Sequence, residues 1–449
     1  MTAPPSSADR AALVDLARAH LWPPYTSAER HAAQDPLVIV EAEGAWLTDA
    51  DGRRYLDAIS SWWTCTLGHR HPRLVAALAA AVARLDHVSA GGAIHPAVAQ
   101  LAAELCAVAP PGLERAHFSD DGSTAVEVAI KMAFQYWQQN GRPARRRFLA
   151  LSSAYHGDTL GAVSLAGAAP GGFFTVFAPL LFEVAHAPAP GPGPGGEDDA
   201  AWDRVAAALE DRLARDGDTI AGVVVEPLLQ GAGGMRTYPA EVLRRLRAAT
   251  TRADTFLIAD EVFTGYGRTG AMWACDLAGV APDLLCTAKG FTAGMLPMAA
   301  TLATARVYDG FRAGADGESR ALMHGHSFSG HPLGAAIARE VLAIYRDEAV
   351  VGGVAPRAAR LAATLAELAG VPGVRRTRQL GLVGAVDLGD GGYGGAAGPR
   401  LTAAARAHGL YLRPLGDTAY LCPPLTIPLP DLELLLERFA ATIRTCAAG

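Results

Sequence analysis

The sequence predicts an α/β fold in which a mainly parallel sheet carries helices on both faces. Helical and short apolar segments alternate from about residue 72 to 330, a pattern typical of such sheets. Composition agrees, because 50% of the 449 residues are apolar, enough for a substantial core in two or three domains. Helices are expected at 72–86, 96–108, 123–140, 202–215 and 239–252, and strands at 147–151, 180–184, 220–225, 255–261 and 284–287.

The two chain ends predict smaller α and β elements. Short strands are expected at 38–40, 45–47 and 55–56, with a turn at 49–52 that contains two aspartates and a glycine. Near the C-terminus, helices at 333–347, 354–369, 400–408 and 430–445 alternate with short strands. The glycine-rich stretches 188–199 and 389–399 are expected to be surface loops.

Charge and cysteine spacing argue against several classes of protein. A net charge of -6 with 19% charged residues is not typical of a nucleic-acid-binding protein. The basic cluster Arg145–Arg147 leads into an apolar strand and is expected to be a solvated loop edge. The sequence contains no apolar stretch of signal-peptide or membrane-spanning length. The six cysteines lack any C-x-x-C spacing, which indicates a reduced cytoplasmic protein.

The most informative residues are a lysine and an acid that each follow an apolar run. Asp260 ends the run 256–259, and Lys289 comes just after the strand expected at 284–287. A lysine amine can hold pyridoxal phosphate as a Schiff base, and an acid beside the pyridine nitrogen keeps that nitrogen protonated. Glu226 follows a third strand. Because ligands of open α/β sheets lie at the carboxyl ends of strands, the three side chains are expected at one edge.

Two further segments could contact the same cofactor. Gly122 and Ser123 stand at the start of an expected helix, where backbone N–H groups and a hydroxyl suit a phosphate. An ordinary helix N-cap is the alternative. Tyr155 could lie flat on the cofactor ring with Val262 on the opposite face, the alternative being a turn with a half-buried tyrosine.

Other motifs favour different chemistry, but less strongly. The run Gly265–Gly270 is formally G-x-G-x-x-G, yet too few residues separate it from Pro282 for the crossover helix of a dinucleotide site. The histidines at His69 and His71, and those within 324–331, have no carboxylate or cysteine at ligand spacing, so no metal site is predicted. The chain contains no G-x-S-x-G motif of a serine hydrolase.

In order and spacing, the chain resembles the class III aminotransferases of pyridoxal-phosphate fold type I over almost its whole length. The resemblance implies a large αβα domain at 61–329 and a small α+β domain from 1–60 and 330–449. It also implies a homodimer with shared active sites that acts on small molecules, with no nucleic-acid or membrane partner. The matching segments are 49–52, 55–57, 122–123, 155–157, 226–227, 230–231, 260–262, 265–270 and 289–290.

Four segments are similar to the branch of this family that aminates 8-amino-7-oxononanoate in biotin synthesis. They are 21–26, 60–63 with its adjacent tryptophans, 230–235, and 412–414 followed by Tyr420. S-adenosylmethionine is the expected amino donor, because a sulfonium and an adenine both gain from aromatic faces. The alternatives are lysine as the donor, or a class III ω-aminotransferase that acts on a diamine or ω-amino acid. Alternatives from other classes are a non-transaminating binding protein of this fold and a nicotinamide-dependent oxidoreductase.

The resemblance implies a role for each site residue. Lys289 would hold the cofactor and move a proton, Asp260 would pair with the ring nitrogen, and Tyr155 would stack on the ring. The other residues implied to bind the cofactor are Gly122, Ser123, Glu226, Val262 and Ser327, the last through the phosphate of the neighbouring subunit. Those implied to bind substrate are Tyr25, Trp62, Trp63, Asp158, Arg268, Gly325, Tyr420 and Arg413, which would clamp a carboxylate with two parallel hydrogen bonds.

Three residues depart from the pattern of this branch. Phe263 stands where a small residue is frequent, His326 where proline is common, and His331 where asparagine is common. Phe263 is expected to reshape the space near the cofactor, and the two histidines are expected to alter the loop that reaches the neighbouring subunit. All three therefore bear on the identity of the amino donor.

Overall fold

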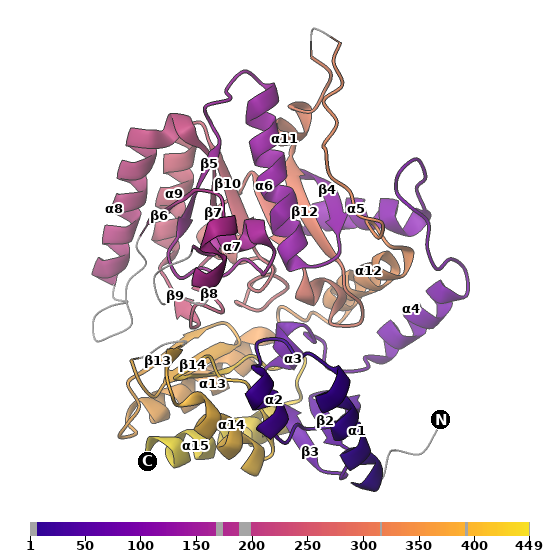
Figure 1. Cartoon of the computed structure of the whole chain (residues 1–449), viewed down its shortest axis with the longest axis vertical. Helices are drawn as coiled ribbons and strands as arrows, with labels where there is room; N and C mark the ends of the chain where they lie inside the picture. Colours follow the sequence, from indigo (N-terminus) through magenta and orange to yellow (C-terminus); the bar gives the residue numbers. More distant parts are fainter. Residues whose placement is uncertain (1–6, 168–173, 188–198, 315–316, 391–393, 449) are drawn as a thin grey trace.

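The computed structural model describes residues 7–167, 174–187, 199–314, 317–390 and 394–448, and Figure 1 shows the path of the chain. Two stretches were expected to be glycine-rich surface loops. Residues 188–198 of the first and residues 391–393 of the second lie outside the described residues.

A seven-stranded sheet forms the centre of the larger part of the molecule. Its strand order is β4-β12-β11-β10-β7-β5-β6, and among the described strands of this sheet β12 alone runs antiparallel to its neighbours. The predicted mainly parallel α/β sheet is therefore confirmed. The strands are β4 (Leu113–Ser119), β5 (Arg147–Leu151), β6 (Val184–Ala187), β7 (Ile220–Val225), β10 (Phe256–Asp260), β11 (Leu284–Thr287) and β12 (Ala299–Thr304).

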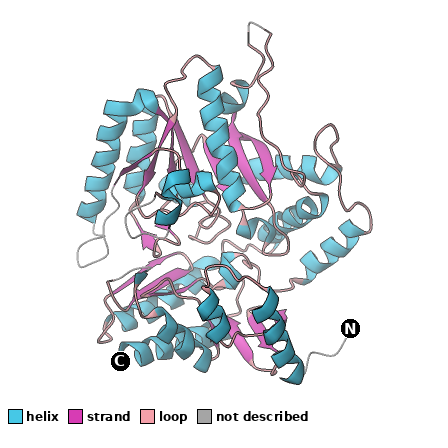
Figure 2. Cartoon of the chain, in the orientation of Figure 1, coloured by secondary structure: helices cyan, strands magenta, loops and turns pink. Residues whose placement is uncertain are grey.

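The side chains of these strands alternate between two apolar layers. On β10, Phe256 and Ile258 belong to the layer under helix α6 (Gly122–Gln139), whereas Leu257 and Ala259 belong to the layer that contains α9 (Ala240–Arg252). Successive strand residues point to opposite faces, so a sheet covered on both sides needs a continuous apolar run. Figure 2 shows helices on either side of this sheet.

The helices around the large sheet include all those expected between 72 and 252. They are α4 (Pro72–Val82), α5 (Pro96–Val108), α6, α7 (Leu160–Ala166), α8 (Asp199–Asp216), α9, α10 (Ala274–Ala278), α11 (Ala305–Asp309) and α12 (Pro332–Asp347). Helix α12 packs against α4 and α5. No helix in the described part of the chain is long and apolar enough to cross a membrane.

The two ends of the chain meet in a second sheet. Strands β1 (Ile39–Glu43), β2 (Trp46–Asp49) and β3 (Arg54–Asp57) are antiparallel, and β3 pairs in parallel with β15 (Leu410–Tyr411) near the C-terminus. In Figure 1 these elements lie below the large sheet, beside the other elements near the chain ends. Those elements are α1 (Ser7–His20), α2 (Ala28–Ala33), α3 (Ser60–Trp63), α13 (Val354–Ala369), α14 (Gly398–Ala407), α15 (Leu429–Ala447), β13 (Arg376–Leu380), β14 (Val383–Asp387) and β16 (Thr418–Leu421). The domain limits 1–60, 61–329 and 330–449 stay a prediction.

The strand predicted at 180–184 is wrong. Residues Thr175–Leu180 form a 3₁₀ helix that contains Pro179, and the side chains of Leu180 and Phe182 are exposed. The strand begins at Val184, which pairs with Phe148 of β5. An apolar run alone did not locate the strand, because pairing with the neighbouring strand selects which residues are buried.

The prediction that Arg145–Arg147 forms a solvated edge is wrong for Arg145. This side chain is buried, with 2% of its surface exposed. Its guanidinium donates to the carbonyl oxygens of Gly217 (2.8 Å), Ile220 (3.1 Å) and Ala253 (2.8 Å). It also lies 4.6 Å from the ring centre of Trp137. Buried charge is tolerated here because backbone carbonyls replace water as hydrogen-bond acceptors.

Replacing Arg145 tests this packing. We expect Arg145→Ala to lower the free energy of unfolding by roughly 3 kcal/mol, because three backbone carbonyls lose a charged donor. Arg146 is exposed, so Arg146→Ala serves as the control and should change stability by less than about 0.5 kcal/mol. Urea unfolding of both variants provides the comparison. Equal, small effects would show that Arg145 is solvated after all.

Candidate active site

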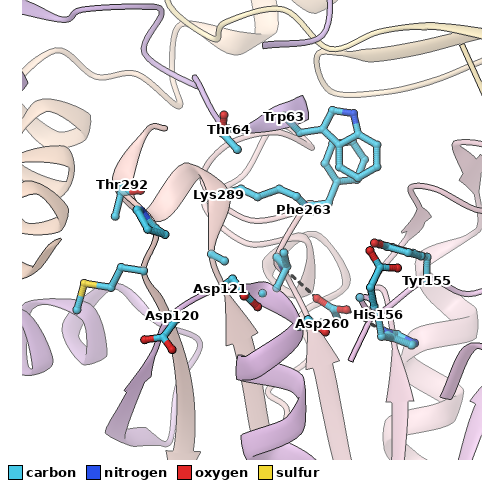
Figure 3. Close-up of a pocket in the computed structure, with 18 of the residues that line it drawn as sticks. Trp63, Thr64, Asp120, Asp121, Tyr155, His156, Asp260, Phe263, Lys289 and Thr292 are labelled. Carbon is cyan, nitrogen blue, oxygen red and sulfur yellow. Dashed lines mark hydrogen bonds and ion pairs between the residues drawn. The ribbon is translucent and has the colours of Figure 1, made fainter. Parts of the chain in front are cut away.

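The candidate site lies at the carboxyl edge of the seven-stranded sheet. Asp260 is the last residue of β10, Glu226 follows β7, and Lys289 follows β11. The strands end almost level, since Ala259 stands opposite Val225 and Asp260 stands opposite Cys286. All three polar side chains line one cavity of about 620 Å³, shown in Figure 3.

The cavity brings together most of the residues singled out in the sequence. Those that line it are Gly122, Ser123, Tyr155, Glu226, Asp260, Val262 and Lys289, with Trp63 and Asp158 from the substrate set. The remaining candidates lie outside this lining: Tyr25, Trp62, Arg268, Gly325, Ser327, Arg413 and Tyr420.

Asp260 is held by a histidine, His156, for which the sequence predicted no role. The His156 Nδ1 atom lies 2.7 Å from Asp260 Oδ2, and both side chains are buried. Burial lowers the pKa of His156, but the hydrogen bond and the charge of Asp260 outweigh burial and raise it. The backbone N–H of Val262 donates to the other carboxylate oxygen, at 3.1 Å. Asp260 is therefore oriented from two sides.

Lys289 presents a buried amine to the cavity. Its Nζ atom lies 4.7 Å from the ring centre of Trp63, and Figure 3 shows the side chain extending toward Trp63 and Phe263. Burial lowers the pKa of the Lys289 amine, while the charges of Asp260 and Glu226 oppose this effect without cancelling it. A lowered amine pKa favours the neutral, nucleophilic form.

Glu226 connects two loops at the sheet edge. Its carboxylate accepts hydrogen bonds from the backbone N–H groups of Tyr155 (3.1 Å) and Gly231 (2.8 Å). Burial raises the pKa of Glu226 to about 7, against the opposing effect of the His156 charge. This acid thus ties the loop after β5 to the segment after β7.

The N-terminus of α6 forms another wall of the cavity. Asp121 is its N-cap and accepts a hydrogen bond from the backbone N–H of Thr124 at 2.9 Å, so the ordinary cap is present. Ser123 Oγ accepts from the backbone N–H of Thr159 at 3.0 Å. A side chain at Gly122 would collide with Val262. The helix start therefore offers a glycine and a serine directly at the cavity, as an anion site requires.

An aromatic cluster with one arginine lies beside the cavity. The hydroxyl of Tyr25 donates to the carboxylate of Asp158 at 2.5 Å and lies 3.4 Å from the hydroxyl of Tyr155. The guanidinium carbon of Arg413 lies 4.3 Å from the ring centre of Trp62 and 5.5 Å from that of Tyr25. We call Tyr25, Trp62 and Arg413 the rim.

Trp63, the second of the two adjacent tryptophans, forms the part of the cavity wall beside Lys289. Trp63 Nε1 donates to the Tyr420 hydroxyl at 3.1 Å, and the Trp63 and Phe263 ring centres are 4.2 Å apart. Phe263 is buried and lines the cavity, so it takes up space beside Lys289. A side chain at Gly231 would meet the Phe263 ring at 2.7 Å.

Arg268, Gly325 and Ser327 belong neither to the cavity lining nor to the rim. Arg268 is buried and donates to the Pro423 carbonyl oxygen at 2.6 Å. Gly325 and Ser327 are exposed, on a segment where His326 pairs with Asp120 at 2.8 Å. Asp120 itself lines the cavity, which links this segment to the site.

The described residues contain no group of three or more His, Cys, Asp or Glu side chains arranged to hold a metal ion. The run Gly265–Gly270 forms turns, and the next helix, α10, is only 5 residues long.

The chain belongs to the class-III aminotransferase family, whose sequence model matches residues 27–443. It is a pyridoxal-phosphate-dependent aminotransferase of fold type I. The chain is 41% identical to adenosylmethionine-8-amino-7-oxononanoate aminotransferase of Geobacter sulfurreducens, over 98% of this chain and 99% of that protein. It is 46% identical to the protein of the same name from Synechococcus elongatus, over 92% of this chain and 96% of that protein.

Solved structures give the same family. The structure of adenosylmethionine-8-amino-7-oxononanoate aminotransferase from Methanocaldococcus jannaschii matches with a TM-score of 0.90 and 32% identity, over 97% of this chain and 99% of that one. An amine transaminase from an uncultivated Pseudomonas species, in its PLP-bound form, matches with a TM-score of 0.86 and 35% identity, over 95% of this chain and 98% of that one. The oxidoreductase and the non-transaminating binding protein are therefore set aside.

Proposed function

We propose that this aminotransferase transfers an amino group from S-adenosylmethionine to 8-amino-7-oxononanoate, giving 7,8-diaminononanoate for biotin synthesis. One observation carries the proposal: a buried lysine amine shares a cavity with a histidine-supported carboxylate, beside a rim of two aromatic rings and a guanidinium. Relatives named for this reaction support the choice of substrate. The alternatives remain lysine as the donor, and a diamine or ω-amino acid as the substrate.

The residues of the cavity fit pyridoxal phosphate. When bound, the cofactor supplies an electron sink for a carbanion. Asp260 would hold the proton on the ring nitrogen, with His156 fixing the carboxylate. Gly122 and Ser123 would hold the phosphate at the start of α6. The residues proposed for the ring faces and surrounding loops are Tyr155, Val262 and Glu226.

Lys289 would both hold the cofactor and move a proton. Burial keeps the pKa of its amine below the usual value, which favours a base that is neutral and able to accept the proton from the substrate carbon. Trp63 and Phe263 lie beside it and would exclude water from the amine, which would strengthen its electrostatic interaction with Asp260 and Glu226.

The substrates would enter past the rim. Arg413 would pair with the keto acid carboxylate, while Trp62, Trp63, Tyr25 and Tyr420 would form the apolar wall. Asp158 and Arg268 would help to accommodate two unlike substrates. The aromatic faces suit a sulfonium and an adenine, which is the reason for choosing S-adenosylmethionine as the donor.

We also propose a cytoplasmic homodimer with shared active sites. Ser327 and Gly325 are exposed and do not line the cavity of their own chain. This location supports a role toward the neighbouring subunit, where Ser327 would reach the cofactor phosphate.

Lysine labelling tests the cofactor attachment. The chain contains two lysines, Lys131 and Lys289, of which Lys131 is exposed on α6. Borohydride reduction followed by peptide mapping should find the pyridoxyl group on Lys289. Lys289→Ala should lose turnover by several powers of ten, whereas Lys131→Ala should keep it. A label on Lys131 would defeat the assignment.

Replacing Asp260 tests the ring partner. Asp260→Asn removes the negative charge that favours the protonated ring nitrogen, so the half-reaction with donor should slow while the cofactor still binds. Rapid mixing with the donor measures the rate, and absorbance measures the bound cofactor. If Asp260→Asn reacts at the wild-type rate, the proposed ring contact is wrong.

Replacing Arg413 tests acceptor recognition. Arg413→Ala should raise the KM for the keto acid, because its carboxylate loses two charged hydrogen bonds, a cost of roughly 2–5 kcal/mol. Arg413→Lys is the matched control. Lysine keeps the positive charge but lacks the planar guanidinium that makes two parallel hydrogen bonds, so Arg413→Lys should restore the keto acid KM only in part. Unchanged acceptor kinetics in Arg413→Ala would remove this residue from the site.

The amino donor can be identified in a single half-reaction. Each candidate donor is mixed alone with the pyridoxal form of the enzyme, and the loss of pyridoxal absorbance is followed. We expect S-adenosylmethionine to convert the cofactor and lysine to leave it unchanged. The reverse result would make lysine the donor while leaving the aminotransferase assignment intact.

A further inference from the structure

The segment that carries both tryptophans has an unusual backbone. Ser60, Ser61, Trp62 and Trp63 have φ values of 48°, 45°, 64° and 74°. Side chains other than glycine rarely adopt this left-handed region, and when they do they occur singly, because the β-carbon crowds the next carbonyl. Four such residues in a row persist only where surrounding contacts hold them.

A buried carboxylate supplies those contacts. Asp57 has no exposed surface and ends β3, and Ala58 and Ile59 connect it to the turn. Its Oδ2 accepts from Ser61 Oγ at 2.8 Å and lies 2.9 Å from His69 Nε2. Its Oδ1 accepts from the backbone N–H of Ile59 at 3.2 Å.

The C-terminal part of the chain anchors the other side of the turn. Ser60 Oγ donates to the Cys422 carbonyl oxygen at 2.7 Å. The backbone N–H of Cys422 donates to the Ala58 carbonyl oxygen at 2.8 Å. The turn is therefore held by hydrogen bonds to Asp57 on one side and to Cys422, directly after β16, on the other.

This conformation determines where the two indole rings lie. Trp62 faces the Arg413 guanidinium at 4.3 Å, and Trp63 faces the Lys289 amine at 4.7 Å. Stacking on the face of a ring leaves the N–H edges of a guanidinium free. Within the described residues, the contacts of the Arg413 guanidinium are with the rings of Tyr25 and Trp62, and it has no hydrogen bond or ion pair. Its position therefore depends on the rim rings.

We propose that Asp57, through Ser61 and His69, is a positioning residue that holds the left-handed turn and thereby places Trp62 under Arg413 for carboxylate recognition. The inference rests on the proposed role of Arg413 and extends it to residues that do not line the cavity. Ser61 acts by restraining the backbone rather than by touching substrate.

The charge state of His69 supports this role. Burial lowers the pKa of His69, but hydrogen bonds with Asp57 and Cys65 raise it more, to about 10. At neutral pH the positive charge of the His69 imidazolium therefore balances the negative charge of the buried Asp57 carboxylate. The same carboxylate accepts a hydrogen bond from the Ser61 hydroxyl.

Two replacements of Ser61 test whether its hydrogen bond to Asp57 matters because it restrains the backbone at positive φ. Ser61→Ala loses the hydrogen bond to Asp57 but keeps the strained β-carbon. Ser61→Gly also loses the hydrogen bond, yet glycine adopts positive φ readily and needs no restraint. On the full-length enzyme with cofactor, we expect Ser61→Ala to raise the acceptor KM roughly tenfold with a smaller change in kcat. We expect Ser61→Gly to stay within about twofold of wild type.

Thermal unfolding of the cofactor-free proteins adds a measurement that does not depend on turnover. The melting temperature of Ser61→Gly should be higher than that of Ser61→Ala, because only the alanine variant has a β-carbon that strains the backbone at positive φ. Equal melting temperatures together with equal acceptor KM values for the two variants would overturn the inference. A fall in kcat alone, with unchanged KM, would indicate loss of folded enzyme and would also overturn it. If wild type fails to turn over 8-amino-7-oxononanoate, the proposed function fails instead, and the melting comparison still tests the turn.

Discussion

The level, parallel ends of β7, β10 and β11 are the constraint on which the site depends. They place Glu226, Asp260 and Lys289 around one cavity. The side chains of Glu226 and Asp260 are buried there, and burial lowers the pKa of the Lys289 amine. Burying a lone charge is costly, so such groups persist only when they compensate one another. His156 completes the balance by pairing with Asp260, and two backbone N–H groups satisfy Glu226.

The second constraint is the pairing of the two chain ends. Strand β15 lies beside β3, so the segment that carries Arg413 and Tyr420 reaches the turn that carries both tryptophans. One wall of the site thus comes from the large sheet and the other from the chain ends. Parts of the chain 357 positions apart share a hydrogen bond there, between Trp63 and Tyr420.

Trp63 connects the two walls. Its ring contacts the Lys289 amine and packs at a tilt against Phe263, and its Nε1 atom donates to the Tyr420 hydroxyl. Phe263 therefore affects the site through packing as well as through the volume that it occupies. A substitution at such a contact can alter the space for substrate without disturbing Asp260 or Lys289, because binding and chemistry are carried by different groups.

The sequence by itself determined the sheet and its principal polar residues, because apolar runs and the acid or lysine after them are local features. Lys289, Asp260 and Glu226 could be located in this way, and the resemblance to a family added the roles of residues such as Arg413. Only the tertiary structure decided that His156 supports Asp260, since the two stand 104 positions apart. It also decided that Arg145 is buried, that β6 begins at Val184, and that Ser60–Trp63 is left-handed. Each of these depends on hydrogen-bond partners distant in sequence, which local patterns do not encode.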